Sequence, residues 1–104
     1  YFSHVPEAVK ARQPYGARHT DEIRFVFGAP AAAFTPADTS LSNAMNAYWA
    51  AFAKTGAPGS AGGPAWPKFD AAREGQIEFT GEGPKVREHF LAAWRDAVEP
   101  LQGK

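Results

Sequence analysis

Apolar residues recur at helical spacing through the middle of the chain and predict its clearest element. The stripe consists of Leu41, Ala44, Met45, Tyr48, Trp49 and Phe52, at i, i+3, i+4, i+7, i+8 and i+11. This spacing places the side chains on one face of a helix of about four turns. Thr39 or Ser40 can cap the first turn, and Lys54 followed by Gly56 is typical of a helix end. We predict a helix that begins at Thr39 or Ser40 and ends before Gly56.

A second apolar stripe predicts another helix near the end of the chain. Its positions are Val86, Phe90, Trp94, Ala97 and Val98. Gly83-Pro84 stands ahead of the stripe, where proline suits the first helical position, and Pro100 ends it. We expect Trp49 and Trp94 in the core rather than on a platform for sugars or bases, because both lie on apolar helical faces. His89, at the edge of this stripe, is expected to be a packing residue.

Alternating apolar and polar residues predict two short strands, at Tyr1–Val5 and at Gln76–Thr80. His4 lies within the first of them and is expected to have an ordinary packing role. Because no turn or cap precedes Tyr1, we expect the chain to start inside an element of a larger domain. A chain of this size buries a smaller share of its unfolded surface than a larger domain does.

Residues 17–27 fit two periodicities. Ile23, Val26 and Phe27 follow helical spacing, whereas Ile23, Phe25 and Phe27 alternate as in a strand. The acidic residues at positions 21 and 22 favour a short helix, because negative charge complements the free N–H groups of a first turn.

Two segments rich in glycine and proline, residues 28–38 and 56–67, are predicted to be loops. Trp66 and Phe69 lie at the end of the second loop. Such large apolar groups would be left in water by a free linker, so we expect this end of the loop to pack down.

Composition narrows the classes of function. The chain has 104 residues, 11 basic and 11 acidic side chains and no cysteine. Without net positive charge or a cationic run, nucleic acid is not an expected partner. The longest apolar run falls short of the ~18 to 20 residues needed for a membrane span. Zero cysteines exclude disulfides and thiolate zinc sites.

Few side chains form a recognisable catalytic or metal-binding pattern. There is no G-x-S-x-G elbow, no phosphate loop and no H-E-x-x-H motif. His19 and Glu22 could share a metal ion, but His4 and His89 lie far away in sequence and no third ligand is evident. We therefore expect neither a metal nor a cofactor. Taken without further context, His19 is best explained as a loop histidine in a local hydrogen bond.

Several blocks of the sequence resemble the type B carboxylesterases, the family that includes the cholinesterases. Tyr15–Gly28 is similar to the family segment Gly-Ala-x-His-x-x-Glu-Ile/Leu-x-Tyr/Phe-Val-Phe-Gly. Leu41–Pro58 resembles a family helix that ends in a Tyr-Trp-x-x-Phe-Ala-Lys-Thr-Gly-x-Pro pattern, and 65–69 resembles a Trp-Pro box. The closing helix at 86–94 is also similar. The resemblance extends from residue 1 to about residue 98 in collinear order.

This resemblance implies an α/β fold, with residues 1–104 forming the C-terminal portion of a single α/β-hydrolase domain: late core strands plus packing helices. It implies a serine esterase in which His19 is the triad histidine, acting as general base and acid. The serine, the triad Glu or Asp and the oxyanion hole would come from an upstream portion of the same enzyme. The substrate would be a small carboxylic ester. Glu22 would be a buried supporting carboxylate rather than the triad acid.

The sequence departs from the family pattern at two loops, and other interpretations stay open. Thr20 follows the histidine where the family often has glycine, and residues 56–59 differ from the family turn. A non-catalytic, cholinesterase-like adhesion or binding protein is the alternative function. An autonomous helical interaction module is a third interpretation. Many bacterial relatives are exported, and the alanine-rich, cysteine-free composition is compatible with a bacterial protein in the periplasm or outside the cell.

Overall fold

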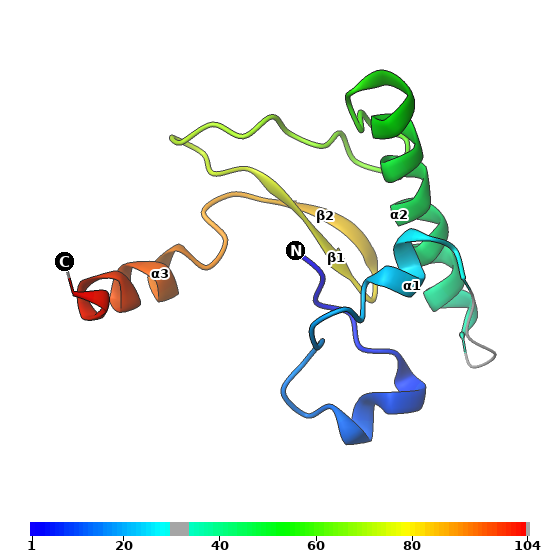
Figure 1. Cartoon of the computed structure of the whole chain (residues 1–104), viewed down its shortest axis with the longest axis horizontal. Coiled ribbons are helices and arrows are strands. Elements are labelled where there is room, and N and C mark those ends of the chain that lie inside the picture. The colour runs from blue at the N-terminus through cyan, green and yellow to red at the C-terminus, as the bar shows by residue number, and fades with distance from the viewer. Residues whose placement is uncertain (30–33, 104) are drawn as a thin grey trace.

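The computed structural model describes residues 1–29 and 34–103, which form a small sheet flanked by helices (Figure 1). The elements in chain order are the 3-10 helix η1 (Glu7–Arg12), α1 (Ile23–Val26), α2 (Pro36–Thr55), β1 (Gln76–Thr80), β2 (Gly83–Arg87), α3 (Ala92–Val98) and the 3-10 helix η2 (Glu99–Gln102). Residues 30–33 of the predicted 28–38 loop lie outside the described residues. No helix in the described ranges has both the length and the apolar character needed to cross a bilayer.

Helix α2 confirms the predicted amphipathic helix, but it begins earlier than expected. Its cap is Thr35, not Thr39 or Ser40. The Thr35 hydroxyl accepts a hydrogen bond from the backbone N–H of Asp38 at 3.2 Å, and the Asp38 carboxylate accepts one from the Thr35 N–H at 2.8 Å. This reciprocal capping box satisfies two N–H groups, and Pro36 has no N–H to leave unpaired. The helix ends as predicted, with Gly56 in the left-handed conformation at φ 79°.

The strand predicted at Gln76–Thr80 is confirmed as β1, and the first residues of the chain run beside it. β1 pairs with β2 in an antiparallel hairpin, from Gln76 opposite Arg87 to Thr80 opposite Gly83. On the other edge, a parallel bridge joins Phe2 to Phe79, with Ser3 N donating to Phe79 O at 3.0 Å. The extended start of the chain is therefore real, although only Phe2 forms a bridge.

The helix predicted from Gly83-Pro84 onward is wrong over its first half. Residues 83–87 form β2, because the turn after β1 brings them back along that strand. Gly83 has φ 109°, outside helical geometry, and the Thr80 hydroxyl donates to its carbonyl at 2.9 Å. Within the described residues β2 has one neighbour, so Pro84 lies in an edge strand, where proline is tolerated. Only the second half is helical. Leu91, directly before α3, has φ 61°, and this left-handed conformation prevents the helix from extending further toward β2.

The core lies where α1, α2 and β1 meet. Its buried apolar residues are Phe25, Val26, Leu41, Met45, Tyr48, Ile77 and Phe79, with Phe2, Phe34 and Trp66 packed against them. Trp66 thus packs down as expected, whereas Phe69 is exposed. Trp49 and Trp94 were expected in the core, but they are 41% and 66% exposed, because nothing in the described part of the chain covers their outer faces.

Candidate active site

His19 lies on a tight turn between η1 and α1, and the backbone of this turn is held on both sides. Asp21 closes the turn: its carboxylate accepts hydrogen bonds from the Arg18 N–H at 2.8 Å and from the buried Gln13 side chain at 2.7 Å. After the turn, Ile23 N donates to Thr20 O at 3.2 Å, which leads the chain into α1. The peptide around His19 is therefore fixed, while its side chain is exposed to solvent.

The charge of Asp21 is favoured by the same contacts. Burial acts to raise its pKa, but the Arg18 N–H and the Gln13 amide outweigh burial and lower the pKa below its usual value. The positive charges of Arg18 and Arg24 act in the same direction. The carboxylate that holds the turn is thus ionised throughout the neutral pH range.

Thr20, directly after His19, has an unusual backbone conformation. Its φ of 74° lies in the left-handed region, which favours glycine and penalises a β-branched residue. Local strain of this kind persists only where the surrounding structure enforces it, and it often occurs beside functional groups. It explains why glycine suits this position in the family pattern that the segment resembles.

The structure does not join His19 to the other candidate residues. Within the described residues no hydrogen bond links it to Glu22 or to a serine. Glu22 is half-buried rather than buried and begins α1, where its carbonyl accepts from Phe25 N and Val26 N at 3.0 Å. Ser3 and Ser42 donate to Glu78 and to the Phe25 carbonyl. The hollow beside the turn is lined by Arg18 and Thr20, and His19 is not among its lining residues.

His89 is not the helical packing residue that the sequence predicted. It lies before α3 with φ 51°, is exposed, and contacts Glu74 with its Nδ1 3.3 Å from a carboxylate oxygen. Over the described residues, no three histidine, aspartate or glutamate side chains cluster as metal ligands. His19 and Glu22 therefore gain no third ligand from this part of the chain.

His4 and Asp38 form a buried pair that the sequence did not predict. The Nε2 atom of His4 lies 2.5 Å from Oδ1 of Asp38, and the two side chains are 12% and 2% exposed. The sequence carries one usable signal for it, the spacing Thr35-x-x-Asp38, which is that of a capping box and would have marked Asp38 as the buried end of a helix. Nothing in the sequence indicates that His4, 34 positions earlier, is the partner of Asp38.

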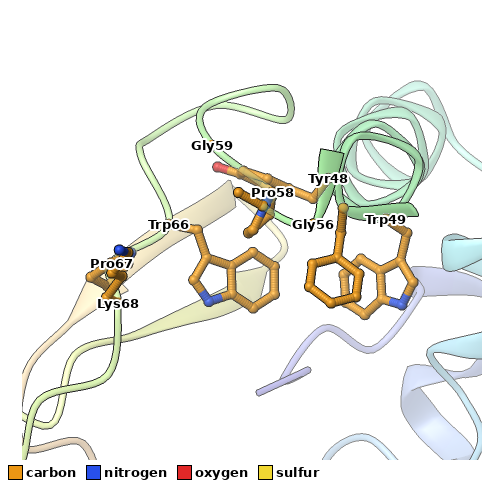
Figure 2. Close-up of a pocket in the computed structure, with 10 residues that line it drawn as sticks. Tyr48, Trp49, Gly56, Pro58, Gly59, Trp66, Pro67 and Lys68 are labelled. Carbon is orange, nitrogen blue, oxygen red and sulfur yellow. The ribbon is translucent and has the colours of Figure 1, made fainter. Parts of the chain in front are cut away.

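A separate apolar groove lies at the C-terminal end of α2, and we call it the tryptophan groove (Figure 2). It is lined by Tyr48, Trp49, Phe52, Gly56, Ala57, Pro58, Gly59, Trp66, Pro67 and Lys68, and has a volume of about 540 Å³. Trp49 from α2 and Trp66 from the following loop stand with their rings 5.7 Å apart at a steep angle. One lining residue, Lys68, carries a charge, so the groove suits apolar groups.

Comparison with known proteins gives a consistent result. The Carboxylesterase family matches residues 1–94. Carboxylesterase 5A of the dog, Canis lupus familiaris, is 35% identical over 93% of this chain and 19% of its own length. A crystal structure of a Geobacillus stearothermophilus carboxylesterase matches at 30% identity with a TM-score of 0.67, over 76% of this chain and 19% of that chain.

The fold is matched over more of the chain by a second solved structure. It is an esterase of Clostridium hathewayi that can hydrolyse aliphatic aromatic polyesters, with 23% identity and a TM-score of 0.75 over 95% of this chain and 20% of its own. This chain therefore spans about a fifth of the length of these relatives. The helices and the small sheet are those of a portion of an α/β-hydrolase, as the sequence predicted.

Proposed function

This chain belongs to the carboxylesterase family, and we propose that it supplies the histidine of a serine-esterase triad, with His19 as general base and acid. The observation that supports this role is the combination of an exposed His19 side chain with a backbone fixed by Asp21 and Gln13. A base must be free to face a substrate and yet stand in one place, because small misplacement of a catalytic group is costly.

In the proposed reaction, one ring nitrogen of His19 takes the proton from a serine hydroxyl as its oxygen attacks the ester carbonyl. The resulting imidazolium then returns the proton to the alkoxide that leaves, so that an acyl-enzyme forms. A water molecule, activated by the same nitrogen, releases the acid and regenerates the serine. An imidazole suits both transfers, because it can accept and return a proton in the neutral pH range.

The other ring nitrogen of His19 would donate to a triad carboxylate, and we propose that this carboxylate is not Glu22. Glu22 is the residue directly before α1, and its backbone carbonyl accepts hydrogen bonds from two N–H groups of that helix. Its place at the N-terminal end of α1 agrees with a supporting role. The serine, the triad acid and the oxyanion-hole amides would then come from an upstream portion of the same enzyme.

The tryptophan groove is the surface that we expect this upstream portion to cover. Trp49 and Phe52 are 41% and 58% exposed there, although both lie on the apolar stripe of α2. A contiguous apolar surface of this kind is typical of a site that another part of a protein covers. The substrate, a small carboxylic ester, would bind at the His19 side of the molecule rather than in this groove.

The decisive experiment replaces the proposed base in the intact enzyme that contains this chain. His19→Ala is expected to lower turnover of a short-chain p-nitrophenyl ester by ~10³ to 10⁶-fold, with the melting temperature unchanged. His89→Ala is the matched control, because His89, like His19, is an exposed histidine with its neighbouring backbone in a turn, but it lies away from the His19 turn.

Three outcomes would contradict the proposal in different ways. A loss of only a few-fold in His19→Ala would remove His19 from the mechanism. An equal loss in His89→Ala would show that the effect is not specific to the turn. Absence of labelling of the wild-type enzyme by a fluorophosphonate serine probe would favour a non-catalytic binding protein with the same fold.

A further inference from the structure

The buried pair of His4 and Asp38 connects two distant parts of the chain. His4 belongs to the extended segment beside β1, and Asp38 lies in the first turn of α2. The pair therefore joins residues 34 positions apart, and residues 5–37 form a loop that it closes. η1, the turn with His19 and α1 all lie within this loop, with His19 near its midpoint.

Each member of the pair is held by further contacts. The second carboxylate oxygen of Asp38 accepts from the N–H and the hydroxyl of Thr35, at 2.8 and 2.9 Å. The ring of His4 stands edge-on to Phe2 and Phe25, with ring centres 6.3 and 5.6 Å away. On a third side, a Cβ atom built at Gly81 would lie 3.0 Å from its Nδ1. The imidazole is thus confined to one orientation.

Phe25 carries this constraint to the turn with His19. It lies in α1, which begins four residues after His19, and it is almost completely buried between His4 and Phe34. Its carbonyl accepts from the Ser42 hydroxyl at 2.9 Å, and the next carbonyl, of Val26, accepts from the Asn46 amide at 3.0 Å. α1 is therefore fixed to α2 from one side and to His4 from the other.

Stability alone is a weak reason for such a pair. Taking an imidazole and a carboxylate out of water costs about as much as their attraction returns, and an apolar pair of the same volume often serves as well. What a buried hydrogen-bonded pair adds is a single geometry, because its atoms are satisfied in one arrangement only.

We propose that His4 and Asp38 are positioning residues for His19: by closing the loop of residues 5–37 and confining Phe25, they set where the His19 ring stands. This inference rests on the proposed role of His19. Neither residue would touch the substrate or donate a proton to it, since Asp38 is buried and the His4 side chain is only 12% exposed with its Nε2 on Asp38. Their effect would be on the rate of the chemical step and not on the binding of the ester.

The test uses His4→Phe, His4→Gln and Asp38→Asn in the intact enzyme. Active sites are counted by titration with a fluorophosphonate, so that misfolded molecules do not enter the rate. We expect His4→Phe and Asp38→Asn to lower kcat per titrated site by about 10- to 100-fold, the effect of misplacing a catalytic group by about 1 Å. KM should stay within about twofold, because uniform binding is not affected. His4→Gln keeps an N–H donor and should recover part of the rate.

Two further measurements separate positioning from general stability. The double variant His4→Phe/Asp38→Asn should be no slower than the worse single variant, because both changes open the same loop. Arg95→Gln, which removes the exposed ion pair between Arg95 and Glu74, should leave kcat per site unchanged.

A kcat per titrated site equal to wild type in both His4→Phe and Asp38→Asn, with only the melting temperature lowered, would overturn the inference. If His4→Phe does not fold, His4→Gln and Asp38→Asn decide by the same measure. Failure of the proposed function is a separate result, because His19→Ala would then keep its activity.

Discussion

Two histidines of this chain have opposite surroundings, and their surroundings decide what each can do. His4 packs edge-on against two phenylalanine rings, and its Nε2 is hydrogen-bonded to Asp38. His19 is exposed on a turn whose backbone is fixed by Asp21. A proton carrier needs access as well as position, so the second histidine suits catalysis and the first suits support.

Acid is expected to weaken the fold through Asp38. Burial acts to raise the pKa of Asp38, but hydrogen bonds from His4 and Thr35 outweigh it and lower the pKa below its ordinary 3.8. The unfolded chain therefore takes up this proton at a higher pH than the folded chain. The contribution of Asp38 to stability is present above about pH 4 and is lost as the pH falls through the lower, folded-state pKa.

Chemical denaturation of the intact enzyme between neutral pH and about pH 3 measures this effect. Asp38→Asn should be less stable than wild type at neutral pH, and the gap should narrow below about pH 4, where the unfolded wild-type chain begins to take up a proton on Asp38. Glu78 is a second carboxylate with a lowered pKa, because hydrogen bonds from Arg87 and Ser3 outweigh the effect of burial. Glu78→Gln therefore tests the same effect at another site. A gap between Asp38→Asn and wild type that stays constant with pH would contradict the assignment.

At the scale of elements, the loop after α2 folds back onto the helix that precedes it. The Tyr48 hydroxyl donates to the Pro64 carbonyl, and Trp66 N donates to Gly59 O at 2.8 Å. Gly62 lies at the closest approach, where a Cβ atom would overlap the Ala44 carbonyl oxygen and the Tyr48 ring. The loop is therefore a packed part of the structure and not a linker.

Gly62→Ala is expected to destabilise the protein by about 1 to 3 kcal/mol, the usual effect of forcing an extra carbon into a packed site. Ala61→Ser is the matched control, because its neighbouring position is exposed. Thermal unfolding of the two variants in the intact enzyme checks the difference. Equal melting temperatures would mean that the loop can move away from α2 without cost.

The elements show how far periodicity alone can go. α2 was predictable because its apolar stripe runs along several turns, and β1 because apolar Ile77 and Phe79 alternate with polar residues, although Glu78 between them is buried too. β2 was not predictable, because Val86, Phe90 and Trp94 have helical spacing. Pro84 did not decide between the two, since proline suits the start of a helix as well as an edge strand. The hairpin turn at Gly83 decided the outcome, and its φ of 109° depends on contacts with β1.

At the scale of the whole molecule, the described residues form an open shape. The radius of gyration is 15.3 Å, compared with about 13 Å for a compact domain of this length. Figure 1 shows that α3, at the C-terminal end of the chain, stands away from both the sheet and α2. α3 is tied back by the ion pair of Arg95 with Glu74, and just before it Phe90 packs on Tyr1 with ring centres 5.1 Å apart.

Residues 1–104 produced alone are therefore expected not to fold cooperatively. Trp49, Phe52 and Trp94 would leave large apolar surfaces in water, which favours a molten or aggregating state. Calorimetry, near-ultraviolet circular dichroism and binding of a hydrophobic dye measure this directly. A sharp thermal transition without dye binding would support the third interpretation, an autonomous module.

The sequence by itself determined the family, the place of His19 in its motif and the elements with a long or clean periodicity, because these depend on residues close together in the chain. Tertiary structure decided the hairpin strand β2 and the pairing of His4 with Asp38. These features arise where distant residues meet and satisfy each other's hydrogen bonds, and local spacing carries no record of which distant residue will arrive.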